Sequence, residues 1–268
     1  MRAALAVAIA ASWFGACGRS EPQASRERAP LSPTLGDAAR AATPSPLPPG
    51  TRQLITVIVP TWDATTAELR LWTRAGTAWK PTRPAWQGVI GKTGAAWGVG
   101  LHGRGAPTGR TGPLKREGDG ASPAGVFALA GTYGYAAKPP AGAGLPYTQV
   151  DASWKCVDDS RSRHYNQILD QRTTRPEWTS AEDMRRSDEL YTWVVDVAHN
   201  AARGPGDGSC IFLHVWGGPD SPTVGCTAMA EATLAELLAR LSPGDLPALV
   251  LLPRAEYDAL AAVWDLPR

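Results

Sequence analysis

The sequence has little net charge, because 27 lysines and arginines nearly balance 25 aspartates and glutamates and leave a formal net charge of +2. Proteins that bind nucleic acid neutralise its phosphates with a broad basic face. The composition excludes such a face, so we expect no nucleic-acid partner. The chain also lacks internal repeats and, after its first residues, any long apolar segment.

Metal-binding patterns are missing as well. Cys210 and His214 are four residues apart and would share one face of a strand. Zinc takes three or four protein ligands, however, and no Cys-x-x-Cys or His-x-x-x-His pair accompanies these two residues. The sequence therefore predicts neither a metal site nor a cofactor.

The first 16 residues have the composition of a secretory signal peptide. A positive charge at Arg2 precedes an apolar run that begins at Ala3 and is too short to span a bilayer. The run ends at Phe14-Gly15-Ala16-Cys17, which resembles a bacterial lipobox. The resemblance implies that Cys17 is lipidated and anchors the mature protein to a membrane of the cell envelope, facing the periplasm. The alternative is an ordinary cleaved signal peptide with an incidental cysteine, and either reading predicts export.

Residues 17–50 are rich in alanine, proline, serine, arginine and glutamate and have few large apolar side chains. Such a segment buries too little surface to offset the entropy of ordering it. We expect it to be a disordered tether. The remaining residues, 51–268, suit one domain, or one domain with insertions.

Short strand signals recur along residues 51–268. Leu54–Val59 is a β-branched run that stops at a proline, and Glu68–Trp72 alternates polar and apolar residues as a half-buried strand does. Helical periodicity appears over Ala230–Leu241, and a second helix is expected over Arg254–Val263. Many short strands with glycine and proline turns predict a mainly-β sandwich or barrel with a few short helices. Further strands are expected at Val89–Gly91, Ala96–Leu101, Gly125–Leu129, Trp193–Val197 and Ile211–Val215.

The segment between Gly131 and Leu190 is mostly polar and without clear periodicity. We expect long, irregular loop insertions there. Long ordered loops are more often functional than decorative, so these insertions are candidates for a roof over an active site.

The most informative segment is Ile211–Met229, IFLHVWGGPDSPTVGCTAM. It places His214 at the end of an apolar strand and Cys226 just after a glycine, Gly225. Cysteine attacks carbonyl carbons as a thiolate, and a nearby imidazole is the usual means of generating one at neutral pH. A side chain at position 225 would obstruct the approach of a substrate backbone. The segment therefore predicts an acyl-transfer site.

This segment resembles the signature of the YkuD-type L,D-transpeptidases, in which a histidine is followed after a loop by Ser/Thr-x-Gly-Cys, here Thr223-Val224-Gly225-Cys226. The resemblance implies a YkuD-like β-sandwich or barrel in which Cys226 is the nucleophile and His214 is its base. It also implies that a backbone carbonyl orients the base, which corresponds to Val215 in this sequence.

Backbone and hydroxyl groups complete the expected site. The N–H groups of Gly225 and Cys226 can stabilise the oxyanion of a tetrahedral intermediate. Thr223 and Thr227 flank the turn with hydroxyls that are candidates for binding substrate or for holding the turn. The alternative is a buried structural cysteine near a hydrogen-bonded core histidine.

The sequence also departs from the family pattern. Many members have histidine where Val224 stands, and arginine followed by asparagine or methionine where Thr227 and Ala228 stand. The absent arginine is a residue expected to contact substrate or brace the loop. These departures concern substrate preference rather than the class of reaction.

A second segment, Lys115–Phe127 (KREGDGASPAGVF), resembles a recurring feature of the same superfamily. It is a turn-rich loop leading into a strand, in which proline fixes φ and glycines supply positive φ. Lys115 is its candidate for binding a substrate carboxylate. The alternative is a loop with a structural role alone.

Four cysteines allow three complete pairings. The lipobox resemblance removes Cys17, and the transpeptidase resemblance requires Cys226 as a free thiol. Cys156 and Cys210 remain, and in an oxidising envelope we expect them to form a disulfide, which contributes about 4 kcal/mol in the chain-entropy model. The alternative is two separate buried thiols.

The resemblance implies an enzyme that transfers acyl groups between peptidoglycan tetrapeptide stems through a thioester on Cys226, attacking at meso-diaminopimelate. A hydrolytic carboxypeptidase or amidase of the same fold is the first alternative. A peptidoglycan-binding lipoprotein without catalysis is the second. Neither the acyl acceptor nor a protein partner follows from the sequence.

Overall fold

Short β-strands make up most of the regular structure of residues 45–268, which the computed structural model describes. The prediction of a mainly-β fold is confirmed. The predicted signal peptide over residues 1–16, the lipidation of Cys17 and all but the end of the tether predicted over residues 17–50 lie outside the described residues. No helix within residues 45–268 combines the length and the apolar character that crossing a membrane requires.

The regular elements are distributed along the whole of the described chain. The helices are α1 (Glu231–Arg240) and α2 (Arg254–Leu260), with a short 3-10 helix at Pro243–Asp245. The strands are β1 (Gln53–Val59), β2 (Thr66–Ala75), β3 (Ala78–Pro81), β4 (Trp86–Val89), β5 (Ala95–Trp97), β6 (Val99–Gly100), β7 (Gly103–Arg104), β8 (Ser122–Gly134), β9 (Tyr147–Gln149), β10 (Trp154–Val157), β11 (Ile168–Asp170), β12 (Ala181–Asp183), β13 (Val194–Val197), β14 (Phe212–Val215), β15 (Thr227–Met229) and β16 (Ala248–Pro253).

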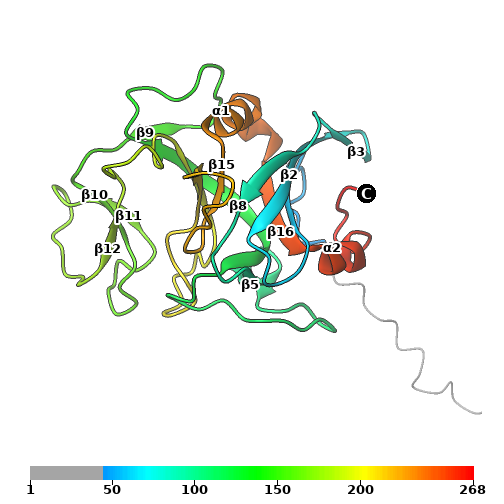
Figure 1. The fold of residues 1–268 in the computed structure, drawn as a ribbon, viewed down its shortest axis with the longest axis horizontal. Helices are drawn as coiled ribbons and strands as arrows, with labels where there is room; N and C mark the ends of the chain where they lie inside the picture. Colours follow the sequence, from blue (N-terminus) through cyan, green and yellow to red (C-terminus); the bar gives the residue numbers. More distant parts are fainter. Residues whose placement is uncertain (1–44) are drawn as a thin grey trace, which may run out of the picture. The chain divides into compact units, whose positions relative to one another are not determined.

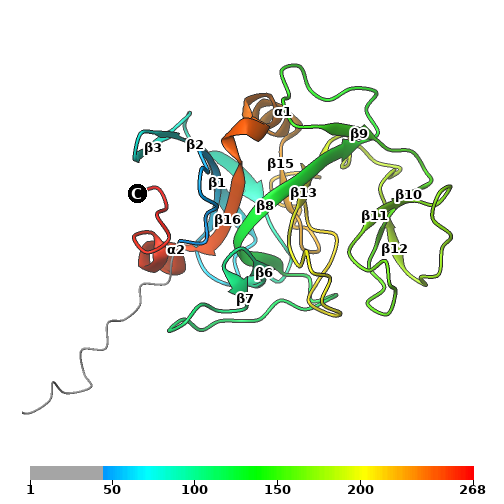
Figure 2. The same ribbon diagram turned by 180° about the vertical axis from the view of Figure 1, so that it is seen from behind.

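The largest sheet closes on itself. Its strands follow the order β1-β16-β8-β13-β14-β15-β4-β2-β3, and β1 also pairs with β2. The β1–β2 pairing joins the path into a closed barrel, with β3 outside the ring as a partner of β2. Figures 1 and 2 show this barrel from opposite sides, with the long β8 crossing its centre.

Two parallel strands, β1 and β16, form the most buried part of the barrel wall. Every residue of both strands is buried. Continuous apolar runs of this kind are typical of strands covered on both faces. α2 packs against β16 and β1, while α1 packs against β14. Leu54, Phe127 and Leu213 are completely buried in the resulting core. The strand β16 was missed in the sequence analysis.

Both predicted helices are present, with slightly different ends. The helix predicted over Ala230–Leu241 is α1, whose Leu234, Leu237 and Leu238 are buried. The helix predicted over Arg254–Val263 ends at Leu260, after which the chain turns.

Two predicted strands were partly wrong. Of Val89–Gly91, only Val89 belongs to β4, and Gly91 forms an isolated bridge with Thr223. The strand predicted over Ala96–Leu101 is divided, because β5 pairs with β8 whereas β6 pairs with β7.

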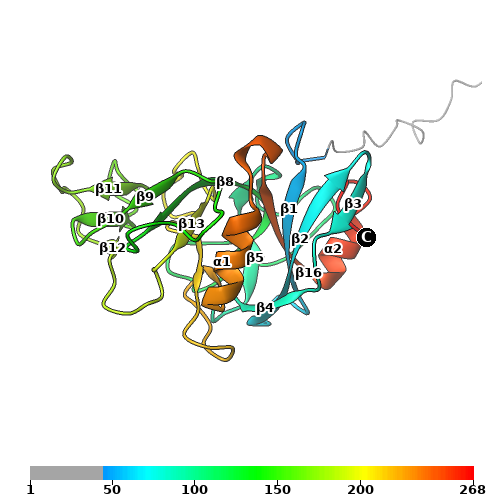
Figure 3. The same cartoon turned by 90° about the horizontal axis from the view of Figure 1, so that it is seen from above.

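The insertion predicted as irregular contains more regular structure than expected. It includes the three-stranded sheet β11-β10-β12, which lies at the end of the domain opposite α2 (Figures 1 and 3). These strands are only three or four residues long, and most of their side chains are half-buried. No alternation of apolar residues therefore marks them in the sequence.

Candidate active site

Cys226 and His214 come together because β14 and β15 are parallel neighbours. In their register Leu213 lies opposite Thr227, and His214 lies opposite Ala228. Side chains alternate between the two faces of a sheet, so Cys226, two residues before Ala228, lies on the same face as His214. Both residues line one cavity of about 260 Å³, which we call the histidine cavity.

The thiol of Cys226 is buried and contacts backbone groups. Its sulfur accepts a hydrogen bond from the N–H of Phe212 at 3.4 Å and donates to the carbonyl of Cys210 at 3.5 Å. Cys226 is the free cysteine of the described residues. Within residues 45–268 no hydrogen bond joins its sulfur to His214. The two side chains therefore line the same cavity without a direct hydrogen bond between them.

His214 is oriented by the backbone. Its Nδ1 lies 2.7 Å from the carbonyl oxygen of Val215. A carbonyl oxygen only accepts hydrogen bonds, so Nδ1 carries the hydrogen and Nε2 is the basic nitrogen. This contact is the one that the sequence resemblance implied for Val215.

Burial keeps both groups uncharged. It lowers the pKa of His214 to about 4, against the opposing effect of the Val215 carbonyl. Burial, reinforced by the nearby Glu182 carboxylate, raises the pKa of the Cys226 thiol to about 12. At neutral pH the cavity therefore holds a thiol and a neutral imidazole rather than an ion pair.

Two hydroxyl groups hold the turn that presents Cys226. Oγ1 of Thr223 donates to the carbonyl of Cys226 at 2.6 Å and accepts from the N–H of Gly225 at 3.1 Å. Oγ of Ser122, on β8, lies 2.7 Å from the Gly225 carbonyl oxygen and 3.0 Å from that of Cys226. Thr223 thus holds the turn, which is one of the two roles expected for it; the other was binding of substrate. Ser122 lies in the Lys115–Phe127 segment, but no contact of its side chain with the Cys226 turn was predicted.

The two N–H groups expected to stabilise an oxyanion differ in their availability. That of Gly225 is engaged with Thr223. Within residues 45–268 the N–H of Cys226 makes no hydrogen bond. The Cys226 N–H is therefore the candidate oxyanion donor of this turn.

Glycine at position 225 is required by the protein's own backbone as well as by the cavity it lines. Its φ is +152°, which side chains rarely adopt. A Cβ atom there would lie 3.3 Å from both the carbonyl oxygen of Ala121 and Cδ1 of Ile211. A side chain at position 225 would therefore crowd these two atoms even in the absence of substrate.

Tyr191 and Glu182 reach the site from the insertion. Tyr191 is 3% exposed, and its ring centroid lies 5.1 Å from that of His214 and 5.8 Å from that of Phe212. Its hydroxyl donates to Oε1 of Glu182 at 2.5 Å. Sequence analysis missed both residues, because they lie in the segment without periodicity.

A second cavity, of about 290 Å³, also reaches Cys226. Lys115, Glu117 and Asp158 are among the charged residues that line it, and we call it the acidic cavity. Glu182, Val224 and Cys226 line both cavities. Val224, at the position where the YkuD-type signature often has histidine, is 70% exposed and presents an apolar side chain to both cavities.

Lys115 braces its own loop. Its Nζ donates to Oδ1 of Asp119 at 2.5 Å and to the carbonyl of Arg116 at 2.7 Å. Asp119 also accepts from the N–H of Ala121. The geometry favours the structural role of this loop, although the side chain of Lys115 lines the acidic cavity.

Thr227 lies apart from both cavities. It is buried in β15, opposite Leu213, and lines neither cavity. Its position fits a role in the barrel wall rather than the predicted contact with substrate.

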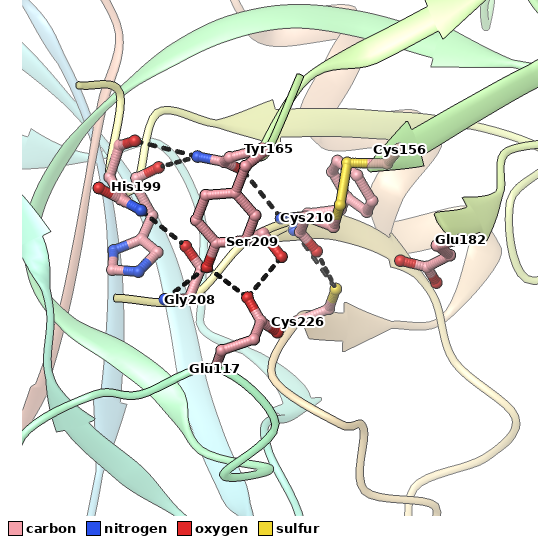
Figure 4. The surroundings of a disulfide bond; sticks show 12 residues. Glu117, Cys156, Tyr165, Glu182, His199, Gly208, Ser209, Cys210 and Cys226 are labelled. Carbon is pink, nitrogen blue, oxygen red and sulfur yellow. Dashed lines mark hydrogen bonds between the residues drawn. A yellow bond between two sulfur atoms is a disulfide. The ribbon is translucent and has the colours of Figure 1, made fainter. Parts of the chain in front are cut away.

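A disulfide joins Cys156 of β10 to Cys210, the pair expected from the sequence. Figure 4 shows Cys226 beside Cys210, whose carbonyl accepts the hydrogen bond from the thiol. Cys156 also lies opposite Glu182 in the pairing of β10 with β12. The disulfide therefore fixes the strand that carries Glu182 next to the segment that contacts Cys226.

No three side chains of histidine, cysteine, aspartate or glutamate lie close enough to hold a metal ion, as far as residues 45–268 are concerned. Comparison of the chain with protein-family models, with curated proteins and with solved structures finds no match.

Proposed function

We propose that the protein is an L,D-transpeptidase-like acyltransferase that acts on the stem peptides of bacterial peptidoglycan. One observation carries the proposal: Cys226 and His214 share one sheet face and one cavity, and the carbonyl of Val215 orients the imidazole. A structural cysteine has no need of an oriented neutral base beside it. The resemblance of Ile211–Met229 and Lys115–Phe127 to the YkuD type supports this class of acyl transfer.

Acylation starts from uncharged groups. Nε2 of His214 takes the proton of Cys226 as the sulfur attacks the carbonyl carbon at the L-centre of meso-diaminopimelate in a tetrapeptide stem. The N–H of Cys226 donates to the oxyanion that forms. The intermediate then expels the terminal D-alanine, whose nitrogen takes the proton from His214, and a thioester remains on Cys226.

The thioester then reacts with an acceptor. An amine of a second stem gives a cross-link, and an amine of another molecule gives an attachment through meso-diaminopimelate. Water gives the hydrolytic outcome of a carboxypeptidase. These products have different masses, so one analysis of the products identifies the acceptor.

We also propose that the protein works in the cell envelope, held at a membrane by a lipid on Cys17. The Cys156–Cys210 disulfide supports export, because disulfides persist in oxidising compartments. The signal-peptide pattern of residues 1–16 supports the same compartment.

The muropeptides of cells that make the native protein, compared with cells that make Cys226→Ala at the same level, test the function. We expect meso-diaminopimelate-linked products, or stems shortened by one D-alanine, to depend on the native protein and to disappear in the variant. Mass spectrometry of digested peptidoglycan measures both. Identical profiles under several growth conditions would support the non-catalytic alternative instead.

A further inference from the structure

Glu182 occupies a central position in the site. Apart from Cys226 itself, it is the titratable residue that lines both the histidine cavity and the acidic cavity. Its side chain is 24% exposed, so a molecule in either cavity can reach the carboxylate. An acyl acceptor that approaches the thioester therefore passes Glu182, whichever cavity it enters by.

A hydrogen bond holds the carboxylate of Glu182 in place. Oε1 of Glu182 accepts the hydroxyl of Tyr191 at 2.5 Å. The ring of Tyr191 is in turn held by edge contacts with His214 and Phe212. The Glu182 carboxylate is thus fixed at the cavity that Cys226 and His214 both line.

Arg186, the cationic neighbour of Glu182, forms its closest ion pair with another carboxylate. Nη1 of Arg186 lies 3.8 Å from Oε1 of Glu182. The guanidinium instead makes short hydrogen bonds, at 2.8 and 2.9 Å, to both carboxylate oxygens of Asp188. Arg186 is therefore paired with Asp188, and Glu182 keeps Tyr191 as its close partner.

We propose that Glu182 is a further catalytic residue, which accepts the proton of the attacking amine in the second half-reaction. The inference rests on the proposed function. It names a primary amine as the acceptor class that the site serves and separates the base of transfer from the base of acylation, His214.

The proton and electron pairs balance without another reactant. The amine nitrogen forms a bond to the thioester carbon, and its proton passes to the Glu182 carboxylate. The carbon–sulfur bond breaks, and its electron pair returns to Sγ. The sulfur takes a proton from solvent water, and Glu182 returns its proton to solvent water. An amide and the free thiol result, with Glu182 ionised again.

The environment of Glu182 suits this role. Burial raises the pKa of its carboxyl group, against the hydrogen bond from Tyr191 and the charge of Arg186. A carboxylate with a raised pKa is a stronger base for a proton leaving nitrogen.

Glu182→Gln tests the inference, because the amide oxygen still accepts the Tyr191 hydroxyl while the basic carboxylate is lost. The protein is acylated with a meso-diaminopimelate tetrapeptide, and the thioester is followed by intact mass after addition of a meso-diaminopimelate tripeptide as the amine. We expect acylation to be no slower than in the native protein, because the lost carboxylate opposes ionisation of the Cys226 thiol. We expect amine transfer to be slowed on the order of 100-fold, the usual effect of losing a general base.

Asp183→Asn is the matched control. It removes a carboxylate from the next position of β12, where the side chain is 62% exposed and pairs with Lys155. We expect this variant to acylate and transfer like the native protein. Glu182→Gln that slows both half-reactions equally, or neither, would overturn the inference. A native protein that forms no thioester would contradict the proposed function itself, and the role of Glu182 with it.

Thermal unfolding of Glu182→Gln and Asp183→Asn checks that the fold is retained.

Discussion

Cys226 and His214 are 4% and 6% exposed, and this burial governs their chemistry. Cysteine nucleophiles that exist as thiolates at neutral pH lie beside a cation or a helix N-terminus. Here the strongest electrostatic influence on the buried thiol, after burial itself, is the carboxylate of Glu182, which opposes ionisation. The proposed nucleophile is therefore expected to react slowly with nonspecific electrophiles in the absence of substrate.

This environment predicts the reactivity of Cys226 toward iodoacetamide. Only the thiolate reacts, and the raised pKa of about 12 leaves little of it at pH 7. We expect alkylation at pH 7 to be at least about 100-fold slower than that of free cysteine, and to rise about tenfold per pH unit above it. Mass spectrometry of the non-reduced protein measures the rate. Alkylation at pH 7 as fast as free cysteine would show a preformed thiolate–imidazolium pair.

The residues that local sequence could predict are those on one short segment. Cys226, His214, Val215 and Thr223 all lie within Ile211–Met229, where strand, loop and glycine patterns are legible. Tyr191 and Ser122 come from distant segments and reach His214 and the Cys226 turn, respectively, only through tertiary packing. A tyrosine or serine by itself carries no local signal of such a contact.

The disulfide links the small sheet β11-β10-β12 to the barrel, since Cys156 belongs to β10 and Cys210 immediately precedes the β14 region. Glu182 and Tyr191 lie beyond Cys156 in the chain and return toward Cys226. The geometry of this part of the site therefore depends on a covalent tie between a surface sheet and the barrel wall.

Removal of this tie, with Cys156→Ser and Cys210→Ser together, is expected to lower the free energy of unfolding. The cysteines are 54 residues apart, and a loop of that length corresponds to about 4 kcal/mol in the chain-entropy model. Equilibrium urea unfolding measures the loss. Reduction of the native protein should reproduce it. A change below about 1 kcal/mol would show that β10 and β14 hold together without the bond.

At the level of strands and helices, sequence patterns predicted the elements with one buried face and the β-branched run of β1, and they missed β16 and the half-buried strands of the insertion. β2 alternates and α1 has a leucine face, and both were predicted. β16 is buried throughout, and β11 and β12 are half-buried, so none of them shows a period. Their existence depends on partners far away in the chain.

For the whole domain, the sequence predicts the fold class but not the pairing of its strands. Composition and turn residues predict a mainly-β fold, but the β1–β2 pairing that closes the barrel and the parallel pairing of β14 with β15 are tertiary facts. That parallel pairing is what brings His214 and Cys226 to one face. The arrangement of the candidate active site therefore depends on the fold of the complete domain and not on the Ile211–Met229 segment alone.

The central claim is that Cys226 carries an acyl group during turnover. Intact-mass spectrometry of the native protein, quenched in acid after mixing with a meso-diaminopimelate tetrapeptide, tests it most directly. We predict an adduct equal to the tetrapeptide acyl group without its terminal D-alanine, removed by hydroxylamine and absent in Cys226→Ala. Release of D-alanine by Cys226→Ala at the native rate, or release by the native protein without any adduct on Cys226, would contradict the account.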